Sequence, residues 1–262
     1  MGDMNWHAHA GIFIHPMYVA AKFGIPLALW GETFWDISGM FSAHDYVRYN
    51  KRMAVEHCLR GYTWQDMLGE EGLTEEDLHW LKFAPDEDVQ RVGLEGICIG
   101  NFFPWDSNEH TKLVTERYGF ESSRQPFERT YRRMSNLDDM HENGIHDYLK
   151  FIKFGYGRAS DHASKDIRGG CMSRAEGLEM VRRYDHVKPT TDLQRWLKYV
   201  DMGEKEFDET CDRFRDPRVW WIQDGQWFKA DPWGGASAYG PVHLESAISD
   251  SRYAPSPSRR VA

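Results

Sequence analysis

The sequence is short of the features that assign a chain to a class at once. Its longest apolar run, Ile25–Trp30, is far too short to cross a bilayer, and a mean hydropathy of -0.67 argues against a membrane protein. It contains no P-loop and no Gly-x-Gly-x-x-Gly fingerprint. Four cysteines lie scattered without a Cys-x-x-Cys pair, which favours reduced, mostly buried thiols over disulfides or a zinc site. No basic and then apolar signal segment opens the sequence, so we expect a cytoplasmic protein that binds no membrane.

Positive charge is also scarce. The 262 residues carry 41 Asp and Glu against 32 Lys and Arg, a formal net charge of -9. Phosphate contacts along a nucleic acid require a basic surface, so this balance argues against a general nucleic-acid binder. Hydrophobic residues make up 41% of the chain and aromatic residues 14%, which is enough for the core of one large domain or two small ones.

Apolar spacing and turn residues predict an α/β arrangement in the first part of the chain. A helix is expected over Ile12–Phe23 and should stop at Gly24. The apolar run Ile25–Trp30 is typical of a strand buried on both faces of a parallel sheet, and Gly93–Phe103 is a second such candidate. Thr74, which three acidic residues follow, has the pattern of a helix N-cap.

The remainder is predicted to be mainly helical. Helices are expected over Asn108–Tyr118, Asp138–Phe154, Ser173–Tyr184 and Thr190–Phe214, and a strand over Trp220–Phe228. Ser173 and Glu176 form a capping-box pattern. Beyond Trp233 the composition shifts to Gly, Ser, Pro and Ala, which predicts a disordered tail. We therefore divide the chain into residues 1–124, 125–233 and 234–262.

The stretch Phe151–Arg168 is the most informative part of the sequence. It packs glycines, lysines, arginines, aspartates, serines and a histidine into eighteen residues, with aromatic residues between them. Glycine lets a backbone approach a ligand closely, and Arg and Lys complement phosphate or carboxylate. The stretch therefore predicts a polyanion site with an acid/base group. The alternative is a salt-bridged helix-turn-helix junction.

The candidate site follows from this stretch and from the end of the first predicted strand. His162 can exchange a proton near neutral pH, although it can equally hold a turn by hydrogen bonding, and Asp161 is the second candidate catalytic residue. Gly31 and Glu32 stand at the carboxyl end of a strand, where open α/β sheets place ligands. The substrate- or nucleotide-binding candidates are Gly31, Glu32, Lys153, Gly155, Arg158, Ser164, Arg168 and Arg174, and no metal ligand is expected. For Lys153, Arg158 and Arg168, pairing with Asp161 and Asp166 is the alternative to binding an anion.

Several ordered motifs resemble one family. They are Trp6–Phe13, Ala21–Leu27, Trp30-Gly31-Glu32, Gly100, Phe103–Asp106, Tyr118-Gly119-Phe120, Tyr148–Arg168, Ser173-Arg174, Glu176-Gly177 and Tyr184-Asp185. Together they are similar to the N-acetyl sugar amidotransferases of bacterial surface-polysaccharide synthesis, over roughly residues 6 to 230. The resemblance implies a partial PP-loop (HUP-like) parallel sheet with flanking helices, followed by a mainly helical C-terminal region.

The same resemblance implies a reaction. Enzymes of this family are taken to adenylylate a carbonyl oxygen with ATP and Mg²⁺, after which ammonia displaces AMP. The acceptor is the acetamido group of a nucleotide-activated sugar, the product is an acetamidino group, and a separate glutaminase subunit supplies the ammonia. AMP is a good leaving group where an amide oxygen is a poor one, so the activation step is chemically reasonable.

The sequence also departs from the family pattern. Family members carry a Ser-Gly-Gly-x-Asp-Ser pyrophosphate loop ahead of the matching region, and this sequence has none. Trp6, His7 and His9 stand where a cysteine pair is usual, and Gly170-Cys171-Met172 replaces a Gly-Arg-Met run. The chain thus resembles a C-terminal portion, and we expect it to need a PP-loop-bearing N-terminal polypeptide to activate ATP.

Two alternatives of other classes remain at this stage. Without the pyrophosphate loop, the chain can be a non-catalytic sugar-nucleotide-binding or partner-docking remnant. His7-Ala8-His9, with His15 as a third imidazole, is also the ligand pattern of a metal-dependent amidohydrolase if it lies at a strand end. The eight-fold βα alternation of such a barrel is absent from the sequence.

Overall fold

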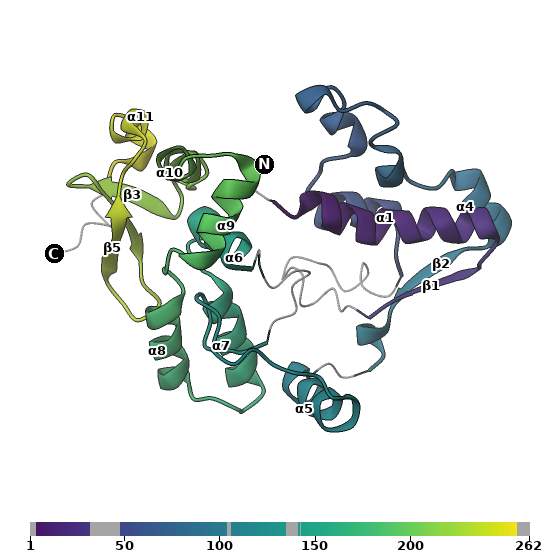
Figure 1. The fold of residues 1–262 in the computed structure, drawn as a ribbon, viewed down its shortest axis with the longest axis horizontal. Coiled ribbons are helices and arrows are strands. Elements are labelled where there is room, and N and C mark those ends of the chain that lie inside the picture. The colour runs from purple at the N-terminus through teal and green to yellow at the C-terminus, as the bar shows by residue number, and fades with distance from the viewer. Residues whose placement is uncertain (1–3, 32–47, 104–105, 135–140, 142, 256–262) are drawn as a thin grey trace. The chain divides into compact units, whose positions relative to one another are not determined.

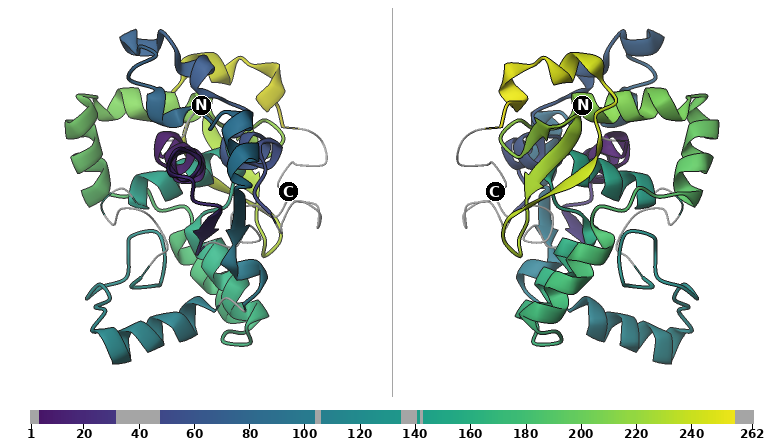
Figure 2. Two further views of the ribbon diagram at one scale, coloured as in Figure 1. Left: turned by 90° about the vertical axis from the view of Figure 1, so that its right-hand side faces the viewer. Right: turned by 90° about the vertical axis from the view of Figure 1, so that its left-hand side faces the viewer.

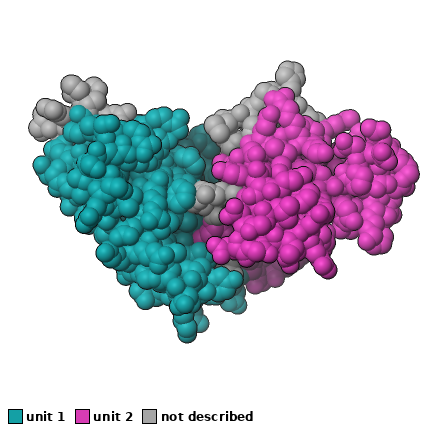
Figure 3. All heavy atoms as spheres, turned by 90° about the horizontal axis from the view of Figure 1, so that it is seen from above, with its two compact units in different colours: residues 1–3, 121–262 teal, residues 4–120 magenta. Residues whose placement is uncertain are grey.

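The computed structural model describes all residues except 1–3, 32–47, 104–105, 135–140, 142 and 256–262. The chain divides into two compact units, Met4–Phe120 and the part from Glu121 onward, which Figure 3 colours separately. We call them the N-terminal unit and the C-terminal unit. The N-terminal unit ends close to the boundary predicted at residue 124, and the segments 125–233 and 234–262 belong to one unit.

Helix α1 and a parallel strand pair form the centre of the N-terminal unit (Figure 1). Helix α1 (Trp6–Phe23) ends at Gly24, whose φ of 67° provides the left-handed cap that the sequence predicts. Strands β1 (Leu27–Trp30) and β2 (Glu95–Cys98) pair in parallel, with Leu27 opposite Glu95. The parallel pairing predicted for these two segments is therefore confirmed.

Burial of β1 on both faces is wrong. Leu27 and Leu29 are 45% and 56% exposed, whereas Trp30 on the opposite face is buried in the core with Phe13 of α1. Side chains alternate between the faces of a strand, so the core covers only one face of this apolar segment. A continuous apolar run cannot distinguish the two cases.

Short helices complete the N-terminal unit. They are α3 (Lys51–Met53), η2 (Ala54–Cys58), η3 (Trp64–Met67), η4 (Glu70–Gly72), η5 (His79–Leu81), α4 (Asp86–Val92), η6 (Ile99–Asn101) and α5 (Ser107–Tyr118). The end of α5 at Gly119 is as predicted. The helix predicted to begin at Thr74 is wrong: Thr74 and Asp77 bond each other as in a capping box, but a turn and the short η5 follow.

The C-terminal unit is mainly helical, as predicted. Its helices are α6 (Asn143–Phe154), α7 (Arg158–Arg168), α8 (Arg174–Tyr184), α9 (Thr191–Val200), α10 (Glu204–Arg213), α11 (Glu245–Ile248) and η7 (Ser251–Tyr253). The Ser173–Glu176 capping box at the start of α8 is confirmed. The single helix predicted over Thr190–Phe214 is two helices, because Asp201 takes a left-handed conformation with a φ of 52°.

An antiparallel sheet of β3 (Trp220–Gln223), β4 (Gln226–Ala230) and β5 (Ala236–Pro241) follows the helices (Figure 2). Asp224 and Gly225, both at positive φ, form the turn between β3 and β4. The disordered tail predicted from residue 234 is wrong over 236–253. Strand β5 pairs with β4, and the Tyr253 ring packs edge-on against Trp227 at 4.9 Å, so contacts distant in sequence order this segment.

The structure also bears on the expectations for the thiols and for a membrane span. All four cysteines are free thiols, and Cys58, Cys98 and Cys211 are buried while Cys171 is exposed. Within the described ranges, none of the helices combines the length and the apolar character needed to cross a bilayer.

Candidate functional site

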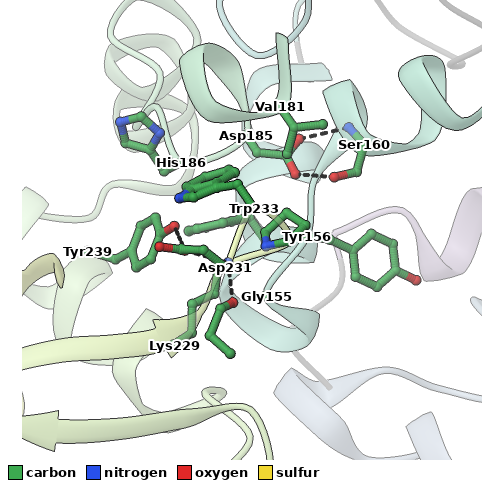
Figure 4. Close-up of a pocket in the computed structure, with 13 residues that line it drawn as sticks. Gly155, Tyr156, Ser160, Val181, Asp185, His186, Lys229, Asp231, Trp233 and Tyr239 are labelled. Atoms are coloured by element: carbon green, nitrogen blue, oxygen red, sulfur yellow. Dashed lines mark hydrogen bonds and ion pairs between the residues drawn. The ribbon is translucent and has the colours of Figure 1, made fainter. Parts of the chain in front are cut away.

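A cavity of about 330 Å³ lies within the C-terminal unit, and we call it the first cavity. The end of α6, the turn before α7, the end of α8 and strands β4 and β5 enclose it (Figure 4). It is lined by Phe151, Gly155, Tyr156, Ser160, Val181, Asp185, His186, Lys229, Ala230, Asp231, Pro232, Trp233 and Tyr239. The half-buried Trp233 ring is held from the α8 side by the Arg182 guanidinium, 5.8 Å from the ring centroid.

A hydrogen-bonded network of polar groups on β4 and β5 borders the cavity. Lys229 Nζ donates to the Ala230 carbonyl at 3.1 Å and lies 3.6 Å from Asp231 Oδ1. The Asp231 carboxylate also accepts hydrogen bonds from Tyr239 Oη and, at 2.5 Å, from Ser237 Oγ. Burial lowers the pKa of Lys229, and the nearby Asp231 carboxylate offsets part of that effect. The buried Lys229 ammonium therefore lies beside the Asp231 carboxylate, which already accepts hydrogen bonds from two hydroxyl groups.

Asp185 caps the N-terminus of α7 from outside that helix. Its Oδ2 accepts from the Gly157 N–H at 2.9 Å. Figure 4 shows its two bonds with Ser160, in which Oδ2 accepts from Oγ at 2.5 Å and Oδ1 accepts from the backbone N–H at 3.0 Å. A helix N-terminus attracts anions because its first N–H groups have no partner within the helix. Here a side chain of the protein already occupies that position, so this helix end has no vacancy for a ligand phosphate.

His186 is the titratable imidazole at the cavity. It is exposed, and its ring meets the Tyr239 ring edge-on at 6.0 Å. Partial burial of the ring and the charge of the nearby Arg129 guanidinium lower the pKa of His186. The side chain is therefore a neutral imidazole at physiological pH and can accept a proton or a hydrogen bond from a bound ligand.

The structure makes the Phe151–Arg168 stretch a helix-turn-helix junction between α6 and α7. Two of its charged residues pair with residues of α6 just before the stretch: Arg158 pairs with the buried Asp147 at 2.9 Å, and Asp161 pairs with Lys150. Arg168 donates to Ser164 at 2.7 Å. These ion pairs agree with the alternative interpretation, a salt-bridged helix-turn-helix junction, and the polyanion site stays a prediction.

The other candidate residues are scattered. Of the predicted site residues that the structure describes, only Gly155 lines the first cavity. Its missing side chain leaves room for neighbouring residues of the protein, because a Cβ on Gly155 would lie 2.6 Å from Val219 Cγ1. Lys153 is half-buried beside the Phe154 ring, and Arg174 is exposed at the start of α8. Gly31 belongs to the N-terminal unit, and Glu32 lies outside the described residues.

His162 lies in the interior of the C-terminal unit. It is 5% exposed, and its Nδ1 is 2.6 Å from Thr130 Oγ1. Burial, reinforced by the Arg132 and Arg158 guanidinium groups, lowers the pKa of His162 to about 3. The imidazole is neutral over the physiological range and does not line the cavity, so these contacts favour the structural role over proton transfer.

This burial predicts a pH-dependent stability. Below pH 6.5, the ordinary pKa of histidine, His162 is protonated in the unfolded chain but stays neutral in the native protein. The free energy of unfolding therefore falls as the pH drops from 6.5 towards 3. From pH 7 to pH 5 the loss should be about 2 kcal/mol, since each pH unit contributes up to about 1.4 kcal/mol. Urea unfolding of the wild type and of His162→Gln measures it. Equal losses in both proteins would contradict the assignment.

Sequence reasoning missed most of the cavity. Trp233 stands at the boundary of the predicted disordered tail, Lys229 and Tyr239 lie on β4 and β5 on either side of it, and Asp231 directly follows β4. Tyr184-Asp185 did carry a signal, because it is part of the family resemblance. Nothing in the sequence around Asp185 indicates that its carboxylate reaches a helix that begins at Arg158.

The ATP–Mg²⁺ expectation stays a prediction, because Mg²⁺ in nucleotide sites commonly binds through one or two carboxylates and the phosphates. Over the part of the chain that the structure describes, no three His, Cys, Asp or Glu side chains gather to hold a metal ion. The strand-end His-x-His of an amidohydrolase is also wrong, because His7 and His9 lie on helix α1. Residues two apart on a helix do not face each other, so this pair cannot act as two ligands of one metal ion.

The comparison with known families gives one match. Residues 115–231 match the family described as LPS biosynthesis protein WbpG-like, C-terminal domain. No curated protein matches the chain. The matched segment contains ten of the thirteen residues that line the first cavity, and Pro232, Trp233 and Tyr239 lie beyond its end.

Proposed function

We propose that this chain acts in LPS biosynthesis as the sugar-binding part of an ATP-dependent amidotransferase. The substrate is a nucleotide-activated N-acetylated sugar, whose acetamido group becomes an acetamidino group with ammonia from a glutaminase partner. The observation that carries the proposal is the position of the first cavity, because ten of its thirteen lining residues lie inside the segment that matches an LPS biosynthesis family.

The lining of the first cavity supports a sugar as its occupant. Phe151, Trp233 and Tyr239 offer apolar ring surfaces, and Lys229 and His186 add polar groups. A pocket that combines apolar faces with a few polar groups is typical of small-molecule sites. Its charged lining groups are one lysine and two carboxylates, a balance that favours an uncharged sugar ring over a pyrophosphate.

ATP activation is assigned to a different polypeptide or segment. Among the described residues no three His, Cys, Asp or Glu side chains gather to hold a metal ion, and the sequence has no pyrophosphate loop. The chain's own contribution would be to bind and orient the sugar and to limit water at the acetamido group. The same two observations favour the second candidate function, sugar-nucleotide binding without catalysis.

Binding is tested first, at Trp233. Trp233→Ala should weaken binding of a UDP-linked N-acetylated uronic acid about tenfold to hundredfold, because truncating an aromatic anchor commonly costs roughly 1.5–3 kcal/mol. Isothermal calorimetry on the full chain measures the dissociation constant. Trp196→Ala is the matched control, since Trp196 is a half-buried tryptophan of the same unit outside the cavity. Equal affinities of the wild type and both variants would remove the cavity as the sugar site.

Catalysis is tested separately. The chain is co-expressed with a PP-loop-bearing polypeptide, and mass spectrometry follows ¹⁵N from labelled ammonia into the sugar in the presence of ATP. Incorporation that requires both polypeptides supports the amidotransferase. Sugar binding without incorporation selects the non-catalytic alternative.

A further inference from the structure

A second cavity, of about 180 Å³, adjoins the first within the C-terminal unit. The two share His186 and Tyr239 as lining residues, so this edge-on ring pair borders both cavities. The second cavity is lined by Tyr148, His186, Lys188, Asp208, Cys211, Asp212, Arg215, Tyr239, Gly240, Pro241 and His243. It is therefore richer in charged and polar groups than its neighbour.

Arg215 is the unusual member of this lining. The side chain is buried at 6% exposure, and its guanidinium carbon lies 4.2 Å from the Trp220 ring centroid and 4.9 Å from that of Trp227. Its Nε donates to Asp212 Oδ1 at 3.2 Å. Its Nη1 is buried and has no hydrogen-bond partner among the described residues. A buried guanidinium N–H without an acceptor destabilises the folded protein, so an acceptor that bonds Nη1 would be bound favourably.

The neighbouring carboxylate cannot fill that role because its oxygens are already bonded. Asp212 Oδ1 also accepts from Trp227 Nε1 at 2.7 Å. Asp212 Oδ2 accepts from the N–H groups of His243 at 2.6 Å and Leu244 at 3.0 Å. Asp208, the other carboxylate of the cavity, pairs with Lys188 at 2.7 Å. The missing acceptor must therefore come from outside this set.

We propose that the second cavity is an oxyanion subsite seated on Arg215. The ligand group is a carboxylate or phosphate oxygen, which a guanidinium binds with a strong charge-assisted bond. His243 lines the same cavity as Arg215, and its side chain is 38% exposed. Burial lowers the pKa of Arg215, which agrees with a charge whose desolvation the protein alone does not fully offset.

This inference rests on the proposed function for the identity of the whole ligand. The first cavity has more lining carboxylates than cations and suits the sugar ring. The second, adjoining cavity contains Arg215, a cation with an N–H group that lacks a hydrogen-bond acceptor within the described part of the chain. A nucleotide-activated uronic acid has two sources of oxyanion, the sugar carboxylate and the diphosphate. Both share the chemistry that Arg215 selects.

The first test uses the wild-type full chain and small anions. Titration with inorganic phosphate or acetate at constant ionic strength is followed by the indole N–H signals in ¹H–¹⁵N spectra. We expect saturable shifts of the Trp220 and Trp227 signals, since both rings flank Arg215. Trp6 and Trp30, whose indole N–H groups bond in the N-terminal unit, are the controls and should not move. Shifts that are absent, or equal at all four tryptophans, overturn the subsite.

The second test separates the two oxyanion sources. UDP-N-acetylglucosaminuronic acid, UDP-N-acetylglucosamine and UDP are titrated into the wild type and Arg215→Lys by calorimetry. Loss of at least about tenfold in affinity for the carboxylated sugar alone identifies the carboxylate. The same loss for all three ligands identifies the diphosphate. No loss for any ligand overturns the subsite. If Arg215→Lys does not fold, the anion titration of the wild type decides alone.

Failure of the subsite and failure of the proposed function give different results. Weaker binding in Trp233→Ala with no change in Arg215→Lys leaves the sugar site and removes the subsite. Saturable indole shifts with phosphate, but no binding of any nucleotide sugar, leave the subsite and remove the proposed function.

Discussion

Replacing Asp185 with alanine should destabilise the C-terminal unit by about 3–5 kcal/mol. The carboxylate accepts from two backbone N–H groups, of Gly157 and Ser160, and from the Ser160 hydroxyl, and it is 4% exposed. Its removal leaves buried donors without an acceptor, and each such donor costs about 1–3 kcal/mol. It also removes a charge that helps to offset the burial of Arg129, so the loss is larger than for one hydrogen bond.

Two controls isolate the cause. Asp185→Asn keeps the shape and one acceptor oxygen, and it should cost about half as much as alanine. Ser173→Ala removes the exposed capping box of α8 and should cost about 1 kcal/mol, the usual value for a solvated cap. Urea unfolding measures all three variants. If Asp185→Ala is no worse than Ser173→Ala, the buried cap does not stabilise the junction as argued.

Sequence patterns correctly predicted the helix ends that are determined by residues close together in the sequence. Gly24 and Gly119 end α1 and α5 because each needs a left-handed φ, and Ser173 with Glu176 begins α8. The Thr74–Asp77 pair shows the limit of such patterns. The hydrogen bonds of a capping box form there, but no α-helix follows, because a cap lowers the cost of a helix start without supplying the apolar face that packs it.

Contacts distant in sequence decided what was missed. The tail was predicted to be disordered on its composition, yet Tyr253 Oη donates to the Arg215 carbonyl at 2.7 Å and its ring packs on Trp227. The cations of the Phe151–Arg168 stretch were candidates for anion binding. Arg158 instead pairs with Asp147, which lies on the preceding helix and is 3% exposed. Composition identifies charged groups but does not show which of them meet inside the fold.

Gly155→Ala should destabilise the C-terminal unit by about 2–4 kcal/mol and displace Lys229 at the first cavity. Gly155 has a φ of 74°, which costs an L-residue roughly 1–2 kcal/mol. The new Cβ would also lie 2.6 Å from Val219 Cγ1 and 3.3 Å from Lys229 Cδ, and such overpacking adds about 1–3 kcal/mol. Calorimetric unfolding gives the stability, and titration of the sugar ligand gives the effect on the cavity.

Gly170→Ala is the matched control for this substitution. Gly170 has nearly the same φ, 72°, but a Cβ there meets nothing within 4 Å, so the variant pays only for the backbone conformation. It should cost about 1 kcal/mol and leave sugar binding unchanged. The difference between the two variants measures how closely Val219, just before β3, and Lys229 of β4 pack against the turn after α6. Equal losses of stability in the two variants would mean that Val219 and Lys229 move aside freely. Glycine at position 155 would then be needed only for the backbone conformation of the turn.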